Sequence, residues 1–370
     1  MTSNFKIQVS QPDISNLEKE LVNKVLDSGW ISSTGEFVDL FESLWASECN
    51  TKYALSVANG TVAIHLILDA LNIGPGDEVI VPSLTFVSTA NAVKYVGAKV
   101  VFADSNPETW CIDIKHVSNL ITPNTKALIA VHLYGNPADM ESLIALCKEK
   151  NIHLIEDAAE APFATINSRR IGSIGIAASF SFYGNKILSS GEGGAITTND
   201  EELYKRMKLL RGQGMDPNRR FFFTEIGYNY RLTNLQCSLL VAQINRKNEI
   251  LAKRMEVFDF YDLYLKNHPY VEMQRVLPGH VNSPWLYTIK FQTGRFDTSK
   301  IAESLAINGI ETRPIFIPIH LLPPYQKEAP MKLDSCEEIS SNGLSLPTSS
   351  KLSLKDAGKV VESLLEVISI

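Results

Sequence analysis

The residue with the clearest chemical potential is Lys186, in the stretch SFYGNKILSSGEGG at residues 181–194. A lysine amine attacks carbonyl compounds only when it is unprotonated, and burial favours that state by lowering its pKa. The glycines that follow it would let the backbone approach a ligand closely. Taken alone, a loop lysine beside glycines is usually an ordinary solvated side chain, so its role depends on its neighbours.

Two carboxylates could serve such a lysine. The segment LIEDAAEA (154–161) places Asp157 at the end of an expected strand and Glu160 at the start of an expected helix. Asp-x-x-Glu is also a capping-box pattern, which is the simpler interpretation. The functional one is a carboxylate at a strand end that keeps a pyridinium nitrogen protonated, because negative charge nearby favours the charged ring.

Four other features could hold a flat, phosphorylated ligand. The Asn-Gly-Thr at 59–61 precedes an amphipathic helix, whose free N–H groups and dipole suit a phosphate, although side-chain capping explains the same residues. Ser181 could add a hydroxyl from the end of its strand. Phe86 follows the strand 78–81 and could stack on a ring or pack in the core. The segment 227–231 (GYNYR) is either a surface turn or an interface or ligand segment.

The elements that would position these residues alternate between strand and helix. Strands rich in β-branched residues are expected at 78–81, 100–103, 127–131, 152–155, 179–182 and 195–198. Helical patterns, such as 140–150, separate most of them. This alternation predicts a largely parallel sheet covered on both faces, with ligands at the carboxyl ends of the strands.

A second region follows residue 240. We expect a long charged helix at 242–265, a helix at 301–308 ending at Gly309, and a helical tail at 353–370. The proline-rich segment 313–325 must be extended or looping. These patterns predict a large α/β domain over 1–245 and a smaller α+β domain over 246–370, with a cleft between them as the default site.

Composition and absent motifs exclude several classes. The 370 residues carry a formal charge of −6 without a Lys/Arg cluster, which argues against nucleic acid as a partner. The five scattered cysteines indicate buried thiols in a reducing compartment, not a metal site. No signal peptide or long apolar span is recognisable, so we expect a cytoplasmic protein without a membrane anchor. The P-loop, HExxH, strand-linked GxGxxG and GxSxG patterns are missing.

Phosphate anchor, stacking aromatic, ring-nitrogen carboxylate and strand-end lysine are what a pyridoxal phosphate site needs. The segments that supply them, together with VHLYGNPADM and GYNYRLTN, resemble in order the DegT/StrS-type nucleotide-sugar aminotransferases. The resemblance runs from about residue 11 to the proline-rich segment. It implies fold-type I: a three-layer α/β/α large domain with a mostly parallel mixed sheet and a small α+β C-terminal domain.

The resemblance also implies a role for each matching residue. Lys186 would be the catalytic residue and would carry pyridoxal 5'-phosphate as an internal aldimine. The other implied cofactor contacts are Gly60, Thr61 and Ser181 at the phosphate, Phe86 on the ring face, Asp157 at the ring nitrogen, Glu160 near the ring hydroxyl and Asn229 reaching the phosphate across a dimer interface. A homodimer with a shared site is therefore implied.

The reaction implied is transfer of an amino group from L-glutamate to the 4-keto carbon of a nucleotide-linked 4-keto-6-deoxy sugar. The segments 26–42, 104–110 and 312–325 resemble the perosamine-forming branch, whose substrate is GDP-4-keto-6-deoxymannose. A dTDP-4-keto-6-deoxyglucose 4-aminotransferase is the close alternative. Candidate sugar or nucleotide contacts are Trp30, Tyr183, Arg313 and His320, with packing or surface charge as the other interpretation for the first three.

Two rival functions are further away. A sugar 3-dehydratase on the same scaffold has histidine in place of the lysine, so Lys186 argues against it. A regulatory protein that kept the fold would have no need to retain all four cofactor features. The resemblance makes O-antigen or a related surface glycan the expected end product.

Overall fold

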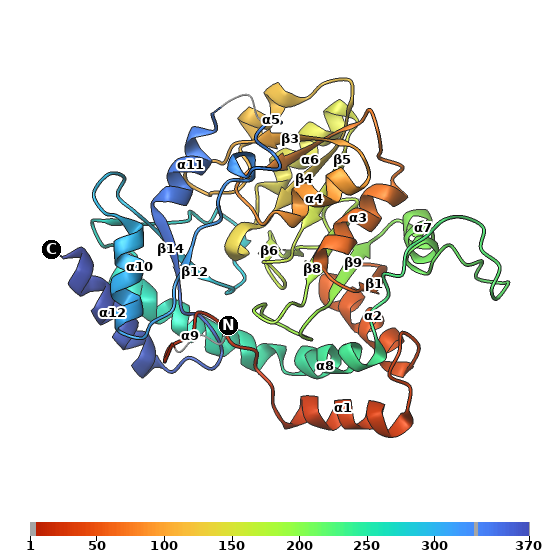
Figure 1. Ribbon diagram of the computed structural model, residues 1–370, viewed down its shortest axis with the longest axis horizontal. Coiled ribbons are helices and arrows are strands. Elements are labelled where there is room, and N and C mark those ends of the chain that lie inside the picture. The colour runs from red at the N-terminus through yellow and green to blue at the C-terminus, as the bar shows by residue number, and fades with distance from the viewer. Residues whose placement is uncertain (1–4, 329–331, 370) are drawn as a thin grey trace.

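A seven-stranded mixed sheet forms the centre of the computed structural model, which describes residues 5–328 and 332–369 (Figure 1). The strands, in sheet order, are β1 (Tyr53–Val57), β9 (Gly194–Thr198), β8 (Ala177–Ser181), β5 (His153–Asp157), β4 (Thr125–Val131), β2 (Glu78–Pro82) and β3 (Lys99–Ala103). Only β9 among these seven runs antiparallel to its neighbours. The predicted fold class, a mostly parallel mixed sheet in an α/β protein, is confirmed.

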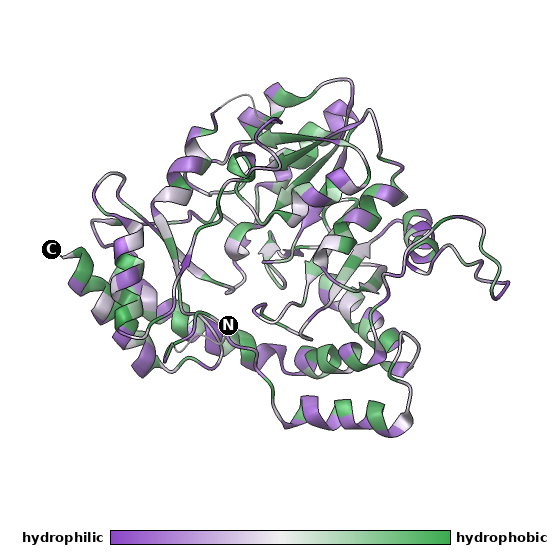
Figure 2. Ribbon diagram, viewed as in Figure 1, coloured by the Kyte–Doolittle hydropathy of each residue, from purple (hydrophilic) through white to green (hydrophobic). Residues whose placement is uncertain are grey.

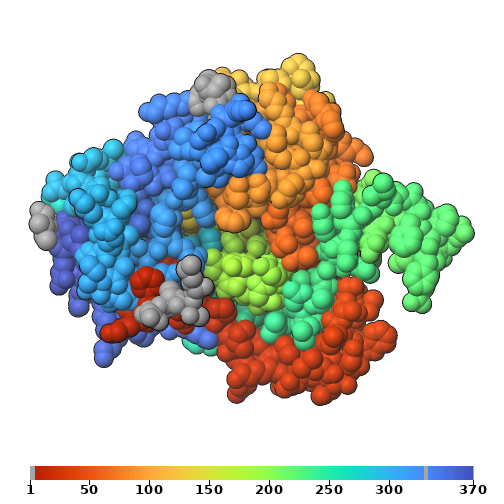
Figure 3. All heavy atoms as spheres, viewed as in Figure 1, coloured from red at the N-terminus to blue at the C-terminus, as the bar shows by residue number. Residues whose placement is uncertain are grey.

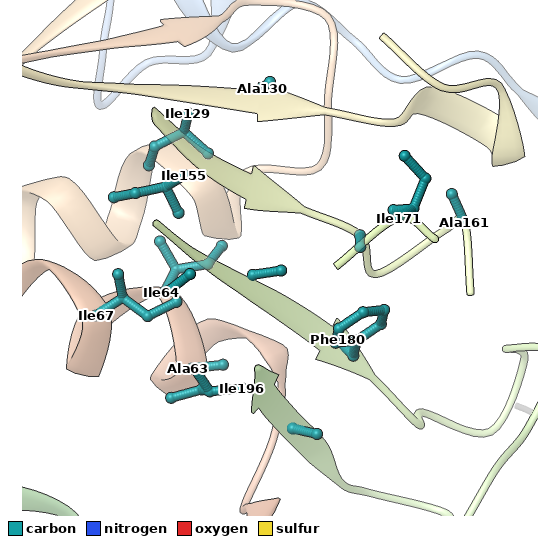
Figure 4. Packing of buried hydrophobic residues seen from close by; sticks show 14 of the residues in the cluster. Ala63, Ile64, Ile67, Ile129, Ala130, Ile155, Ala161, Ile171, Phe180 and Ile196 are labelled. Carbon is teal, nitrogen blue, oxygen red and sulfur yellow. The ribbon is translucent and has the colours of Figure 1, made fainter. Parts of the chain in front are cut away.

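Helices cover both faces of this sheet, because its strands are apolar on both sides. Side chains alternate along β8, so Phe180 and Ser181 point to opposite faces. Phe180 packs edge-on against Trp45 of α2 (Glu36–Cys49), with ring centroids 5.1 Å apart. On the other face, α3 (Gly60–Ala70) packs its apolar stripe, including Ile64 and Ile67, against the sheet (Figure 4). Figure 2 shows the hydrophobic residues concentrated on these central strands.

The remaining helices of this part are α1 (Asn16–Ser28), α4 (Ser88–Tyr95), α5 (Ile114–Leu120), α6 (Met140–Lys150), α7 (Glu201–Arg211) and α8 (Asn234–Asn245). The long helix expected at 242–265 is interrupted: α8 ends at Asn245 and α9 (Lys247–Leu265) begins after Arg246. The Arg246 guanidinium donates to Glu18 of α1 at 2.7 Å and to Asp13 at 3.2 Å. The break therefore lies where this arginine binds the N-terminal segment.

A second, four-stranded antiparallel sheet lies in the C-terminal part. Its strands, in order, are β10 (Val271–Met273), β12 (Tyr287–Phe291), β14 (Gly343–Leu346) and β13 (Arg313–Pro314). The helices α9, α10 (Thr298–Ile307) and α12 (Leu354–Ile368) share a buried apolar cluster with it. The expected helices at 301–308 and in the tail are thus confirmed as α10 and α12, whereas Ile370 lies outside the described residues.

Apolar contacts cross the expected domain boundary at residue 245. Ile7 packs in the C-terminal cluster, whereas Ile315 and Ile319 pack in the N-terminal one. The proline-rich segment that carries the latter two is extended, with β13 at one end and the short 3-10 helix η2 (Ile319–Leu321), as expected. The exact division into two domains stays a prediction.

Smaller elements complete the chain: the 3-10 helix η1 (Leu133–Gly135), the helix α11 (Asp334–Ser341), and a three-stranded sheet of β11 (His280–Val281), β6 (Thr165–Ile166) and β7 (Arg169–Arg170). All five cysteines are buried free thiols, as predicted. Across residues 5–328 and 332–369, none of the helices combines the length and apolar character that a bilayer span requires. The segment after α7, drawn in green, projects from the body of the molecule (Figures 1 and 3).

Candidate active site

A cavity of about 540 Å³ lies where β5 and β8 end, between the central sheet and the C-terminal part. Both parts of the chain line it. The predicted site residues that line it are Gly60, Thr61, Phe86, Asp157, Glu160, Ser181, Tyr183, Lys186 and Arg313. Residues far apart in the sequence are thus brought to one place, at the strand ends where the sequence pattern placed it.

Lys186 lies inside this cavity, and its side chain is only 12% exposed. Its Nζ is 3.8 Å from Glu160 Oε1 and 3.6 Å from the ring centroid of Trp285. Burial lowers the pKa of the Lys186 amine, with Arg313 adding to the effect and the carboxylates of Glu160 and Asp157 opposing it. The interpretation of Lys186 as a solvated surface lysine is therefore wrong, and its surroundings favour the reactive, unprotonated amine.

Glu160 faces Lys186 from a turn, not from the helix that was expected to start there. The residues after β5 form turns, so the expected helix and its capping box are wrong. Pro162 explains this, because a proline disfavours the helical conformation of the residue before it. Glu160 Oε2 instead accepts a hydrogen bond from the Tyr134 N–H at 2.7 Å. Burial, assisted by Asp157, raises the pKa of Glu160 to about 7 against the opposing effects of Lys186 and that N–H.

Asp157 is the last residue of β5, as expected, and is buried at the cavity. Its Oδ2 accepts a hydrogen bond from the Thr89 hydroxyl of α4 at 2.8 Å. Its Oδ1 accepts one from the Ala159 N–H at 3.2 Å. Two different elements therefore fix this carboxylate at the strand end.

The N-terminus of α3 forms a cradle with β8 and β9. Asn59 caps the helix by accepting from the Val62 N–H at 3.0 Å, so the capping interpretation holds for this residue. Gly60 and Thr61 follow it at the cavity wall. A Cβ on Gly60 would lie 3.1 Å from Ser181 Cβ, and one on Gly194 would lie 2.5 Å from the Asn59 carbonyl carbon. Gly194 therefore lets β9 pack directly against the backbone at the N-terminus of α3, and a side chain on Gly60 would press on Ser181.

Four aromatic side chains form a row along the cavity. Phe86 is 55% exposed and its ring centroid lies 6.0 Å from that of Phe316. Phe316 stacks on Tyr134 at 5.2 Å, and Tyr134 stacks on Trp285 at 6.1 Å. The core interpretation of Phe86 is wrong, because more than half of its side chain faces open space.

Sequence reasoning missed the other three members of this row. Trp285 and Phe316 lie over 95 residues beyond Lys186 in the sequence, and no local pattern links them to it. Tyr134 carries one local signal: it lies in the quoted VHLYGNPADM segment, and it adopts the left-handed φ of 54° that is uncommon for a bulky residue. Such conformations cluster at functional sites.

Three predicted residues lie away from the cavity. His320 is buried, with Nδ1 2.7 Å from the Ser83 hydroxyl and Nε2 3.2 Å from Glu337, so both ring nitrogens have partners within the chain. Trp30 is 64% exposed on the loop after α1. Asn229 is exposed near Gly212, beyond the projecting segment. The role predicted for Asn229 is at the phosphate of a second copy of the chain, and Trp30 is not among the residues that line the cavity.

The cavity fits pyridoxal 5'-phosphate. The N-terminus of α3, with Gly60 and Thr61 at the cavity wall and Ser181 beside them, suits the phosphate. Phe86 would offer a ring face, Asp157 a fixed carboxylate for the ring nitrogen, and Lys186 the amine that could join the cofactor. When bound, the cofactor supplies an electron sink for carbanion chemistry at amino and keto carbons.

Comparison with known proteins agrees with this fit. Residues 12–365 match the DegT/DnrJ/EryC1/StrS aminotransferase family. The chain is 43% identical to a "GDP-perosamine synthase" of Caulobacter vibrioides, covering 98% of both chains. It is 39% identical to one of Escherichia coli O157:H7, covering 98% of this chain and 99% of that one. It is similar to the PLP-form of "Putative sugar aminotransferase Spr1654" from Streptococcus pneumoniae, with a TM-score of 0.93, 27% identity and 98% coverage of each chain.

Proposed function

Because this chain belongs to the DegT/DnrJ/EryC1/StrS aminotransferase family and is thus a pyridoxal-phosphate-dependent sugar transaminase, we propose that its substrate is GDP-4-keto-6-deoxymannose. The amino group would come from L-glutamate, and the product would be GDP-perosamine. The observation that carries the transaminase activity is Lys186, buried opposite Glu160 in a cavity that also presents Asp157 and the α3 N-terminus. The names of the two GDP-perosamine synthases, similar over nearly their whole lengths, support the choice of sugar.

The side chains divide the work of this reaction. The lowered pKa of Lys186 leaves its Nζ free to take the proton from the α-carbon of glutamate and, in the second half, to deliver one at C4 of the sugar. The Asp157 carboxylate would hold the proton on the ring nitrogen of pyridoxal 5'-phosphate, because opposite charges favour the protonated ring. The raised pKa of Glu160 lets it hold or release a proton near neutral pH at its contact with Lys186.

Substrate contacts are proposed for the residues at the mouth of the cavity. Tyr183 lines it and is 51% exposed, and Arg313 lines it from β13 in the C-terminal part. A guanidinium and a phenol there suit the anionic phosphates and hydroxyl groups of a nucleotide sugar. His320 is left out, because its ring nitrogens are bound within the protein.

A homodimer with a shared site is also proposed. The projecting segment exposes several large apolar side chains, with Phe221 73% and Ile226 94% exposed. Exposed apolar groups of this size usually mark an interaction surface. Asn229 follows directly, so a second copy that covers this segment could receive the Asn229 side chain at its own phosphate cradle.

The two half-reactions test the proposal separately. Protein loaded with pyridoxal 5'-phosphate should lose its visible absorbance band when L-glutamate is added, and regain it when GDP-4-keto-6-deoxymannose follows. Lys186→Ala should show neither change, because it lacks the amine that moves the proton. Loss of the band without recovery by the GDP sugar would reject the substrate and retain the transaminase.

A further inference from the structure

Trp285 lies against Lys186 although it belongs to the C-terminal part of the chain. The Lys186 Nζ is 3.6 Å from the centroid of its ring. The indole Nε1–H donates to the backbone carbonyl of Asn185 at 2.9 Å, so the ring is tied to the residue next to Lys186. Trp285 is itself buried, just before β12.

The backbone of Trp285 is fixed from behind by Arg254 of α9. Arg254 is 1% exposed, and its Nη1 donates to the carbonyl oxygen of Trp285 at 3.0 Å and, over longer distances, to those of Pro284 and Thr348. Burying a guanidinium costs free energy, and the hydrogen bonds that these backbone carbonyls accept from it offset part of that cost. Its placement holds the tryptophan backbone while the indole N–H holds the ring.

An aromatic face suits a lysine that must both ionise and react. The charged groups that act on Lys186 are Glu160, Asp157 and Arg313. The other titratable groups that line the same cavity are Glu192, Tyr134 and Tyr183. A further carboxylate would hold the ammonium strongly and suppress the free amine. The negative face of an indole attracts the ammonium more weakly and binds no proton.

We propose that Trp285 is a positioning residue for Lys186: its ring face holds the side-chain ammonium beside Glu160 whenever the amine has no covalent partner. This inference rests on the proposed function, in which the Lys186 amine is free while it moves protons in both half-reactions and must stay near the reacting carbon. A free lysine side chain has several rotatable bonds, so a fixed ring limits where its amine can go.

The test measures the protonation of Lys186 directly in the full-length protein freed of cofactor. Trace acetylation at a series of pH values, read by peptide mass spectrometry, gives the apparent pKa of Lys186, with the exposed Lys300 as internal reference. Trp285→Leu should lower this pKa by about 0.5 to 1 unit, because the ammonium loses the ring. Trp285→Phe, which keeps a ring face, should fall between Leu and the wild type.

A nearly isosteric change separates the ring face from packing. Replacing the four tryptophans by fluorotryptophan weakens the negative ring faces and should lower the Lys186 pKa in the wild type. The same replacement in Trp285→Phe should leave it unchanged. Phe316→Leu, which removes a ring from the far side of Tyr134, is the matched control and should not shift the Lys186 pKa.

Two outcomes would overturn the inference. One is an unchanged or raised pKa in folded Trp285→Leu together with no effect of fluorination. The other is an equal effect of fluorination in the wild type and in Trp285→Phe. The pH dependence of the rate at which added pyridoxal 5'-phosphate reacts with Lys186 should show the same changes in apparent pKa. This second measurement checks the result during reconstitution of the protein. Neither readout involves a sugar, so a failure of the proposed substrate leaves this result unaffected.

Discussion

At the scale of single residues, burial decides the chemistry of the site. Lys186 Nζ and Glu160 Oε1 lie 3.8 Å apart in the cavity wall. Burial lowers the pKa of Lys186 and raises the pKa of Glu160, so both move toward neutrality. The same residues on a solvated surface would be fully ionised and unreactive at neutral pH. Position in the fold, more than residue type, is what would make Lys186 a nucleophile.

Glu160→Gln should change how stability depends on pH. Because the pKa of Glu160 is raised to about 7 from 4.5, the folded wild type keeps a proton that the unfolded chain loses. The contribution of Glu160 to the stability of the wild type is therefore fully present below about pH 4.5 and is lost as pH rises through about 7. In cofactor-free protein, the free energy of unfolding of Glu160→Gln relative to the wild type should rise by about 2–3 kcal/mol between those pH values. Urea titrations at both pH values measure this, and a constant difference would contradict it.

At the scale of elements, local patterns predicted the strands well and the junctions poorly. The expected strands correspond to β2, β3, β4, β5, β8 and β9, because strands buried on both faces of a sheet are short apolar runs. The helix expected at Glu160 and the unbroken helix at 242–265 were wrong. Pro162 and the pairing of Arg246 with Glu18 explain these two errors, and the second depends on a contact across 228 residues that local patterns do not carry.

Glu18→Gln should weaken the contact between α1 and Arg246, the residue between α8 and α9. Burial raises the pKa of Glu18, but hydrogen bonds from Ser15 and Arg246 outweigh it, so the pKa is lowered overall. Its stabilisation is therefore present above about pH 4.5 and lost as pH falls through the lower folded value. We expect the variant to lose about 2 kcal/mol of unfolding free energy at pH 7 and less in acid. Chemical denaturation measures this loss, and an equal loss at both pH values would contradict the ion pair as its cause.

Gly194→Ala should damage the phosphate cradle. The new Cβ would lie 2.5 Å from the Asn59 carbonyl carbon, so the N-terminus of α3 must move away from β9. We expect a loss of about 1–3 kcal/mol in stability and weaker binding of pyridoxal 5'-phosphate, measured by fluorescence titration. Gly358→Ala in α12 is the control, since its Cβ meets only Phe260 at 3.8 Å and should stabilise the helix slightly. Unchanged cofactor binding in Gly194→Ala would contradict the cradle.

At the scale of the whole molecule, the site joins distant parts of the chain and, as we propose, two chains. The sequence predicted the residues of the large part, because each ends or follows a recognisable element. Trp285 and Phe316 could not be predicted, since they reach the cavity only through the packing of the C-terminal part on the sheet. The Asn229 side chain is exposed in the single chain, which is consistent with a role at the phosphate site of a second copy.

Mixed dimers test the shared site. Lys186→Ala and Asn229→Ala should each be nearly inactive alone. In a mixed dimer, one site would combine Lys186 and Asn229 from different chains and be intact. Random mixing of equal amounts should then restore roughly a quarter of the wild-type activity. Mixing without recovery, while size-exclusion chromatography shows dimers exchanging, would contradict a contribution of Asn229 across the interface.

The central claim is that Lys186 serves the amination of a GDP-linked 4-keto-6-deoxy sugar. The most direct measurement is a mass-spectrometric product assay in which the protein, pyridoxal 5'-phosphate and L-glutamate act on equal amounts of GDP-4-keto-6-deoxymannose and dTDP-4-keto-6-deoxyglucose. We predict conversion of the GDP sugar to its 4-amino product, with 2-oxoglutarate formed in equal amount, and no conversion by Lys186→Ala. Amination of the dTDP sugar alone, or of either sugar by Lys186→Ala, would contradict the account.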